Sequence, residues 1–120
     1  MLNKVALVFL GGGIGSVLRY LLNYSFTFLQ MNQVSTMGVN ILGSFIFGIV
    51  YVSVAQNTIL SIFLLTGILG GFTSFSQFTF DLIELNSQSP FLSLIYLFGT
   101  VIISILAGLF GVYIATKMVN

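Results

Sequence analysis

The chain has 120 residues, of which 58% are hydrophobic and only 4% are charged. A soluble domain takes about a quarter of its residues from Asp, Glu, Lys and Arg, so this composition excludes a soluble protein and indicates an integral membrane protein. His and Cys are absent, which excludes disulfides and most metal centres and nucleophilic sites. A net charge of +1 gives no basic surface for nucleic acid.

Four apolar stretches are long enough to cross a bilayer, which takes about 20 residues of helix. They cover residues 5–22, 36–55, 59–80 and 91–116, and short polar segments separate them. Because the first stretch is long and carries Arg19 where a signal peptide would have a small-residue cleavage site, it is interpreted as a membrane span. The sequence therefore predicts an all-α fold: a single four-helix transmembrane domain over residues 1–120.

The first span combines a glycine-rich run with one cation. Gly11 and Gly15 are four residues apart, a spacing that lets transmembrane helices approach closely. No Lys follows the run, as a phosphate-binding loop requires, so helix packing is the better interpretation. Arg19 lies toward the end of the span. It is either an anchor at the membrane edge or part of a vestibule for anions.

The second span contains Asn40 within otherwise apolar sequence. Its amide offers two donors and an acceptor that hydrocarbon cannot satisfy. An asparagine in this position either holds helices together or contacts an ion. Both roles remain open from the residue type alone.

The third span contains the adjacent glycines Gly70 and Gly71, followed by the hydroxyl residues Thr73 and Ser74. A glycine pair with Ser or Thr nearby makes irregular backbone tolerable at membrane depth. The sequence therefore predicts an interrupted third helix near residues 70–74. Broken transmembrane helices expose carbonyls that coordinate cations.

Aromatic and hydroxyl side chains alternate directly after this break. Phe75 and Phe78 are three residues apart and share a helix face, and Thr79 joins Phe75 four residues on. Ser76 adds a further hydroxyl. Phe stripes usually contact lipid or core, but the mixture of rings and hydroxyls after a break favours the lining of a pore.

The distribution of cations leaves the orientation of the chain weakly determined. Lys4 and Lys117 lie near the two termini, which share a side when the number of spans is even, and Arg19 lies toward the other side. This asymmetry is too small to impose one orientation, so the chain is expected to insert both ways. Four spans are also few for enclosing a pore, which favours assembly with a second copy.

Three blocks together make the sequence similar to the Fluc/CrcB family of small fluoride channels. They are GGGIGSVLRY at residues 11–20, GVNILGSF at residues 38–45 and GGFTSFSQF at residues 70–78. The resemblance implies a multi-pass cell-membrane protein that is not an enzyme and exports fluoride from the cytoplasm by passive electrodiffusion. It also implies a dual-topology antiparallel homodimer, with a paralogous subunit as an alternative partner.

The same resemblance assigns roles to individual residues. It places Asn40, Phe75 and Phe78 along the fluoride pore, and Arg19 near the pore entrance. It also implies a structural Na⁺ that is not transported, held between the two subunits by the backbone carbonyls of Gly70 and Thr73. The family commonly has Thr where this chain has Gln77, so a hydroxyl contact with the ion is not expected at position 77.

The residue types agree with an anion path. Fluoride loses a strong hydration shell, so its path needs replacement donors, which the Asn40 amide, the hydroxyls and the positive ring edges supply. Two other functions compete. A small proton-coupled multidrug exporter needs an acidic residue inside a span, whereas Asp81 and Glu84 fall at the end of the third stretch. A non-conducting structural membrane subunit would use Asn40 and the Phe pair only for packing.

Overall fold

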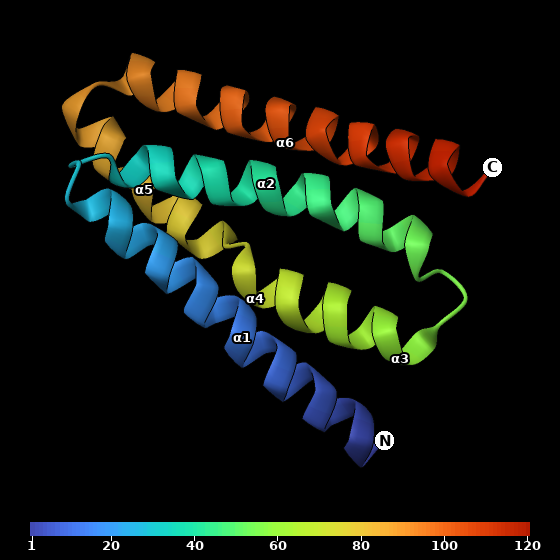
Figure 1. The fold of residues 1–120 in the computed structure, drawn as a ribbon. Helices are drawn as coiled ribbons and strands as arrows, with labels where there is room; N and C mark the ends of the chain where they lie inside the picture. Colours follow the sequence, from blue (N-terminus) through green and yellow to red (C-terminus); the bar gives the residue numbers. More distant parts are fainter.

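A computed structural model describes all residues from 1 to 120, and every regular element is a helix (Figure 1). The elements are α1 (Leu2–Thr27), α2 (Asn32–Ser53), α3 (Thr58–Ser61), η1 (Ile62–Leu69), α4 (Gly70–Phe72), α5 (Phe75–Gln88) and α6 (Pro90–Val119). The third predicted helix is divided into α3, η1, α4 and α5. The prediction of an all-α fold with an interrupted third helix is confirmed.

Four helical runs are long and apolar enough to cross a membrane. They are Leu2–Thr27, Asn32–Ser53, Thr58–Gln88 and Pro90–Val119. Most of them extend past the apolar stretches of the sequence because their ends are polar residues that still form helix: the first continues to Thr27 and the second begins at Asn32. Hydropathy marks the apolar part of a helix, whereas the backbone continues beyond it.

Short polar caps set two of the helix starts. The Asn57 side chain accepts a hydrogen bond from the amide of Leu60 at 3.0 Å, and Ser89 accepts one from the amide of Leu92 at 3.3 Å. Pro90 occupies the first turn of α6, where its missing amide hydrogen costs nothing. Ser89 and Pro90 explain why the chain reverses between the third and fourth runs without a long loop, and Asn57 starts the third run in the same way.

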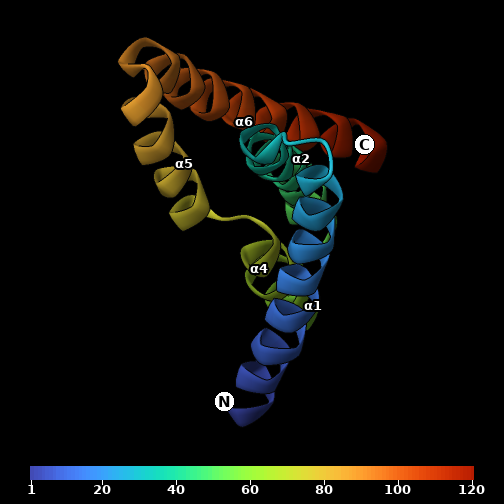
Figure 2. The ribbon, with the colours of Figure 1, turned by 90° about the vertical axis from the view of Figure 1, so that its left-hand side faces the viewer.

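The helices pack as two groups, and in each group the long helices run in the same direction (Figure 1). α2 packs along α6, α1 packs along η1 and α4, and α5 packs on α6. Figure 2 shows α5 standing apart from α1, with the break between α4 and α5 bridging the two groups. Both termini lie at the same end of the molecule as the connection between α2 and α3 (Figure 1).

Glycines allow the closest helix crossings. A Cβ added at Gly15 would overlap the carbonyl of Ile68 in η1, and one added at Gly48 in α2 would overlap the carbonyl of Gly108 in α6. Gly11 and Gly67 likewise meet backbone to backbone. The prediction that Gly11 and Gly15 serve helix packing is confirmed, and such close approaches explain how helices without charged contacts are held together.

The segment η1 is a π-helix of eight residues, which the sequence did not predict. Its last turn is closed by the amide of Gly70, which donates to the carbonyls of Leu65 and Gly67. Such i→i+5 bonding is rare and usually limited to one turn. Every residue from Ile62 to Leu65 is apolar, so the hydropathy pattern of this stretch does not distinguish an α-helix from a π-helix.

Candidate functional site

The third helix is interrupted over two residues. α4 ends at Phe72, after which Thr73 (ψ 153°) and Ser74 (φ −147°, ψ 112°) are extended, and α5 begins at Phe75. The Ser74 hydroxyl accepts a hydrogen bond from the amide of Gln77 at 3.1 Å. Ser74 is therefore the N-cap of α5, and the break is narrower than the predicted region of residues 70–74.

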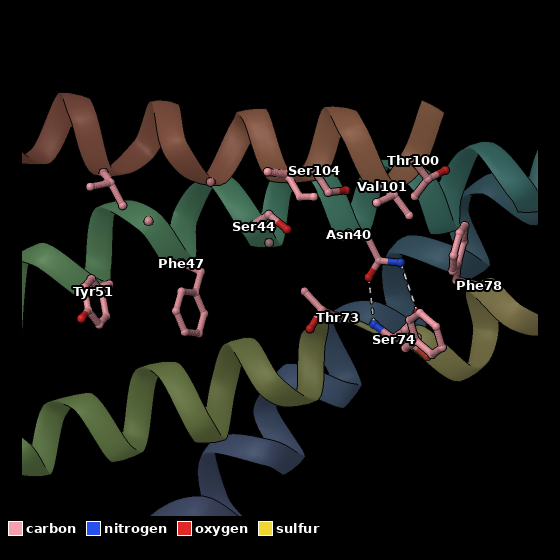
Figure 3. Close-up of a pocket in the computed structure, with 16 residues that line it drawn as sticks. Asn40, Ser44, Phe47, Tyr51, Thr73, Ser74, Phe78, Thr100, Val101 and Ser104 are labelled. Carbon is pink, nitrogen blue, oxygen red and sulfur yellow. Dashed lines mark hydrogen bonds between the residues drawn. The ribbon is translucent and has the colours of Figure 1, made fainter. Parts of the chain in front are cut away.

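Asn40 of α2 holds this break in place. Its Oδ1 accepts a hydrogen bond from the Ser74 amide at 2.9 Å, and its Nδ2 donates to the Ser74 carbonyl at 3.1 Å (Figure 3). The Asn40 side chain thus replaces the acceptor that the Ser74 amide would have in a continuous helix, and it adds a second donor to the Ser74 carbonyl, which also accepts from the Phe78 amide at 3.5 Å. One hydrogen on Nδ2 remains for another acceptor, so Asn40 combines the helix-holding role with a free donor.

Two donors from α1 reach the other carbonyls of the break. Arg19 Nη1 donates to the Thr73 carbonyl at 3.3 Å, and the Ser16 hydroxyl lies 3.5 Å from the Gly71 carbonyl. A cation is favourable here because the carbonyls at a helix C-terminus carry partial negative charge. Neither interpretation of Arg19 from sequence included this contact, since its partner is 54 residues away.

A groove of about 600 Å³ runs from this break along α2 and α6. Its walls come from α2, the break, the start of α5 and α6, and no charged side chain lines it. The lining residues are Asn40, Gly43, Ser44, Phe47, Gly48, Tyr51, Thr73, Ser74, Phe75, Phe78, Thr100, Val101, Ser104, Ile105, Gly108 and Val112. Figure 3 shows Asn40 and Phe78 toward one end of this groove and Tyr51 at the other.

The structure brings only some of the predicted site residues to the groove. Phe75 and Phe78 both line it, with ring centroids 5.7 Å apart, although Phe75 is 78% exposed and Phe78 only 2%. Ser76 and Thr79 do not line it. The Thr79 hydroxyl donates to the Phe75 carbonyl at 3.0 Å, and the Ser76 hydroxyl lies 3.2 Å from that of Ser74.

Arg19 and Gly70 also lie outside the groove lining. Gly70 is exposed, and its carbonyl lacks the usual helical partner because the Ser74 amide donates to Asn40 instead. The Thr73 carbonyl has Arg19 as a donor and a second lone pair for another contact. The carbonyls of Gly70 and Thr73 are therefore both released from helical bonding, because the amides of Ser74 and Gln77 donate to side chains instead.

Two groove residues are missed by the sequence analysis. The hydroxyls of Thr100 and Ser104 in α6 are buried and have no hydrogen-bond partner, although buried polar groups nearly always have one. Both residues line the groove. The available signal is their spacing of four residues in an apolar span, which places both hydroxyls on one helix face. By its size alone, Ser104 is equally typical of a residue that only serves helix packing.

Asp81 is the most buried charged residue, although it follows the last residue of the third apolar stretch, residues 59–80. It lies inside α5 and is 1% exposed. Its Oδ1 accepts from Gln77 Nε2 at 3.0 Å and its Oδ2 accepts from the Tyr96 hydroxyl at 2.9 Å. Asp81 is not among the groove-lining residues, so its carboxylate is enclosed by protein donors.

The comparisons agree with the motifs in the sequence. The chain matches the family described as CrcB-like protein, Camphor Resistance (CrcB), over residues 6–112. It is 39% identical to the fluoride-specific ion channel FluC of Agrobacterium fabrum over 125 residues, which covers 98% of this chain and 99% of the relative. Proteins of the same name from Phocaeicola vulgatus and Gloeothece citriformis are 34% and 35% identical, over 95% and 98% of this chain and over 99% and 97% of their own lengths.

Proposed function

Because the chain belongs to the CrcB family, we propose that it is a channel through which fluoride leaves the cytoplasm by passive electrodiffusion. It is a multi-pass membrane protein of a channel family, and not an enzyme. The single observation that carries the proposal is the uncharged groove that holds two buried hydroxyls without partners, Thr100 and Ser104. Such donors are free to bind an anion that has given up its water.

The chemistry of the groove suits a small, strongly hydrated anion. The free hydrogen of Asn40 Nδ2 and the hydroxyls of Thr100 and Ser104 replace part of the hydration shell. Phe75 and Phe78 add ring edges, which carry the positive part of the aromatic quadrupole. No Lys or Arg lines the groove, which favours conduction because binding must be weak enough for the ion to leave.

The proposed channel is an antiparallel dimer in which a second copy, or a paralogous subunit, covers the open side of the groove. Phe75 lines the groove and yet is 78% exposed in the single chain, so a pore formed by this ring needs a further wall. The weak asymmetry between Lys4, Lys117 and Arg19 permits both orientations. Two antiparallel copies would enclose two equivalent routes.

The proposal includes one structural Na⁺ between the copies, bound by the carbonyls of Gly70 and Thr73. The donor chemistry fits, because carbonyl oxygens freed by a helix break are neutral, hard ligands and need no carboxylate. The exposed position of Gly70 suits a ligand shared with a second copy. The ion would hold the two breaks together and would not be transported.

Liposomes containing only this protein test the function. We expect fluoride efflux, followed with a fluoride electrode, to greatly exceed efflux from protein-free liposomes, and chloride efflux under the same gradient to stay at background. A non-conducting structural subunit would pass neither ion. A proton-coupled multidrug exporter would require a proton gradient and an organic cation, so fluoride efflux without a proton gradient separates these alternatives from the proposal.

Removing the unpartnered hydroxyls should separate conduction from stability. In Thr100→Val and Ser104→Ala the folded protein loses a buried polar atom without a bond, so the thermal midpoint should be unchanged or slightly higher. Fluoride flux should fall by about tenfold for each, the equivalent of one lost hydrogen bond of about 1.4 kcal/mol. Ser53→Ala is the control, because that hydroxyl bonds to the Ile49 carbonyl of its own helix at 2.9 Å. If both groove variants conduct fluoride like the parent, the two hydroxyls do not contact the passing ion.

Withdrawal of Na⁺ should weaken the dimer. In buffer with Na⁺ we expect a dimer in detergent, and in buffer with only a bulky organic cation we expect monomers to appear over the same protein concentrations. Light scattering coupled to size-exclusion chromatography measures both states. An equally stable and active dimer without Na⁺ would contradict the cation site, and a monomer in both buffers would contradict the dimer.

A further inference from the structure

One polar cluster, centred on the buried carboxylate of Asp81, is not part of the groove or the helix break. It consists of Gln77 and Asp81 in α5 and Tyr96 in α6, joined by two hydrogen bonds to the Asp81 carboxylate at 3.0 Å and 2.9 Å. No ion pair involves this carboxylate, and α2, the other helix packed against α5, contains no charged residue. The two neutral donors are therefore the groups that stabilise this carboxylate.

The cluster lies directly beside the groove. Phe78, which lines the groove, is three residues before Asp81 on the same helix, and its ring centroid is 5.4 Å from that of Tyr96. Thr100, whose hydroxyl lines the groove without a partner, is one helical turn after Tyr96. The Asp81 carboxylate, which accepts from the Tyr96 hydroxyl, therefore lies next to residues that form the wall of the groove.

We propose that Gln77 is a positioning residue: its amide holds the Asp81 carboxylate away from the groove, so that an anion passing Phe78 meets no negative charge. The inference rests on the proposed fluoride conduction. The hydrogen bonds support this role, because each oxygen of the Asp81 carboxylate has one donor, which fixes its orientation. Neither Gln77 nor Asp81 lines the groove. Without the Gln77 donor, Asp81 Oδ1 would be buried and unpaired, an arrangement costly enough to drive it toward another hydrogen such as that of Thr100.

The variant Gln77→Met tests this role, because it keeps the length of the side chain and removes the donor. We expect fluoride flux to fall by about tenfold or more, since the freed carboxylate repels the anion. Adding Asp81→Asn in the same chain removes the charge, and flux should return to within about twofold of the parent. A purely structural role for Gln77 predicts no such recovery, because the double variant still lacks the original bond.

Glu84→Gln provides the matched control for the second substitution. Glu84 is one turn further along α5, is exposed, and accepts a hydrogen bond from Gln33 at 3.1 Å. Combined with Gln77→Met, it neutralises a carboxylate that does not adjoin the groove and should leave flux low. Recovery with Glu84→Gln, or no recovery with Asp81→Asn, would overturn the proposal.

A second measurement does not depend on transport. Thermal midpoints in detergent for the parent, Gln77→Met, Asp81→Asn and the double variant form a double-mutant cycle. We expect the two substitutions to be non-additive, since the residues share a hydrogen bond, and additive midpoints would overturn the contact. If the parent passes no fluoride, the proposed function fails on that result alone, while the cycle still decides whether Gln77 positions Asp81.

Discussion

Asn40→Asp is expected to reduce fluoride flux to near the level of protein-free liposomes. The new carboxylate would stand in the groove, where Asn40 now presents its free amide hydrogen. A unit charge about 4 Å from a passing anion opposes it by roughly 4 kcal/mol at an effective dielectric constant of about 20. That energy corresponds to about a thousandfold in rate, and initial efflux rates from liposomes at matched protein density measure it.

Asn40→Ala separates the charge from the lost contacts. It removes both hydrogen bonds to Ser74. The Ser74 amide then has no partner, at a cost of about 1–3 kcal/mol, whereas the Ser74 carbonyl keeps the Phe78 amide. We expect the thermal midpoint to fall for both variants: Ala makes neither bond, and a carboxylate keeps the bond from the Ser74 amide but places its second oxygen against the Ser74 carbonyl. Flux should fall further for the Asp variant than for the Ala variant. If the Asn40→Asp protein conducts like the parent, Asn40 does not contact the ion.

The second large effect is expected for Gly15→Val, which should prevent the chain from folding. A Cβ at this position would overlap the carbonyl of Ile68 and lie 2.8 Å from the amide nitrogen of Phe72. Both are backbone atoms, so α1 would have to move away from η1 and α4 at a cost above the roughly 1–3 kcal/mol typical of overpacking. The Arg19 contact with Thr73, one turn further along α1, would then be lost.

The yield of monodisperse protein in size-exclusion chromatography and the thermal midpoint measure this effect. Gly13→Val is the matched control, because a Cβ at Gly13 meets no atom within 4 Å in the single chain. It makes the same change of volume and of helix propensity in the same helix. A Gly15→Val protein that elutes and melts like the control would show that the crossing of α1 with the third helix is not tight.

The parts of the fold that depend on local sequence were predictable. Four apolar runs require four spans, and Gly70 and Gly71 followed by hydroxyl residues predict the break to within a few residues. The side chains that hydrogen-bond to the backbone of the break were not predictable. Asn40 is 34 residues from Ser74, and Arg19 is 54 residues from Thr73. A single sequence identifies a polar side chain in a span, but not which distant backbone group it meets.

The site residues were predictable where both the residue type and its position within a span indicated a role in an ion path. Asn40, Phe75 and Phe78 are expected along a path and line the groove, while their roles toward fluoride stay predictions. The burial of Asp81 was not predictable, because hydropathy ends the third span at residue 80, whereas α5 continues to Gln88 and buries the carboxylate. Asp81 is buried because α6 packs over it and the Tyr96 hydroxyl donates to its carboxylate. Hydropathy along one segment does not predict a contact between two helices.

The π-helix from Ile62 to Leu69 has a consequence for how the chain tolerates changes of length. A segment with i→i+5 bonding differs from an α-helix by one surplus residue per widened turn, so a single-residue deletion there can be absorbed by a return to i→i+4 bonding. Gly67, which meets Gly11 of α1, would keep its packing only if the deletion fell before it. A deletion of one residue between Ile62 and Thr66 would thus change the helical register ahead of this crossing and leave the break at Thr73 and Ser74 in place.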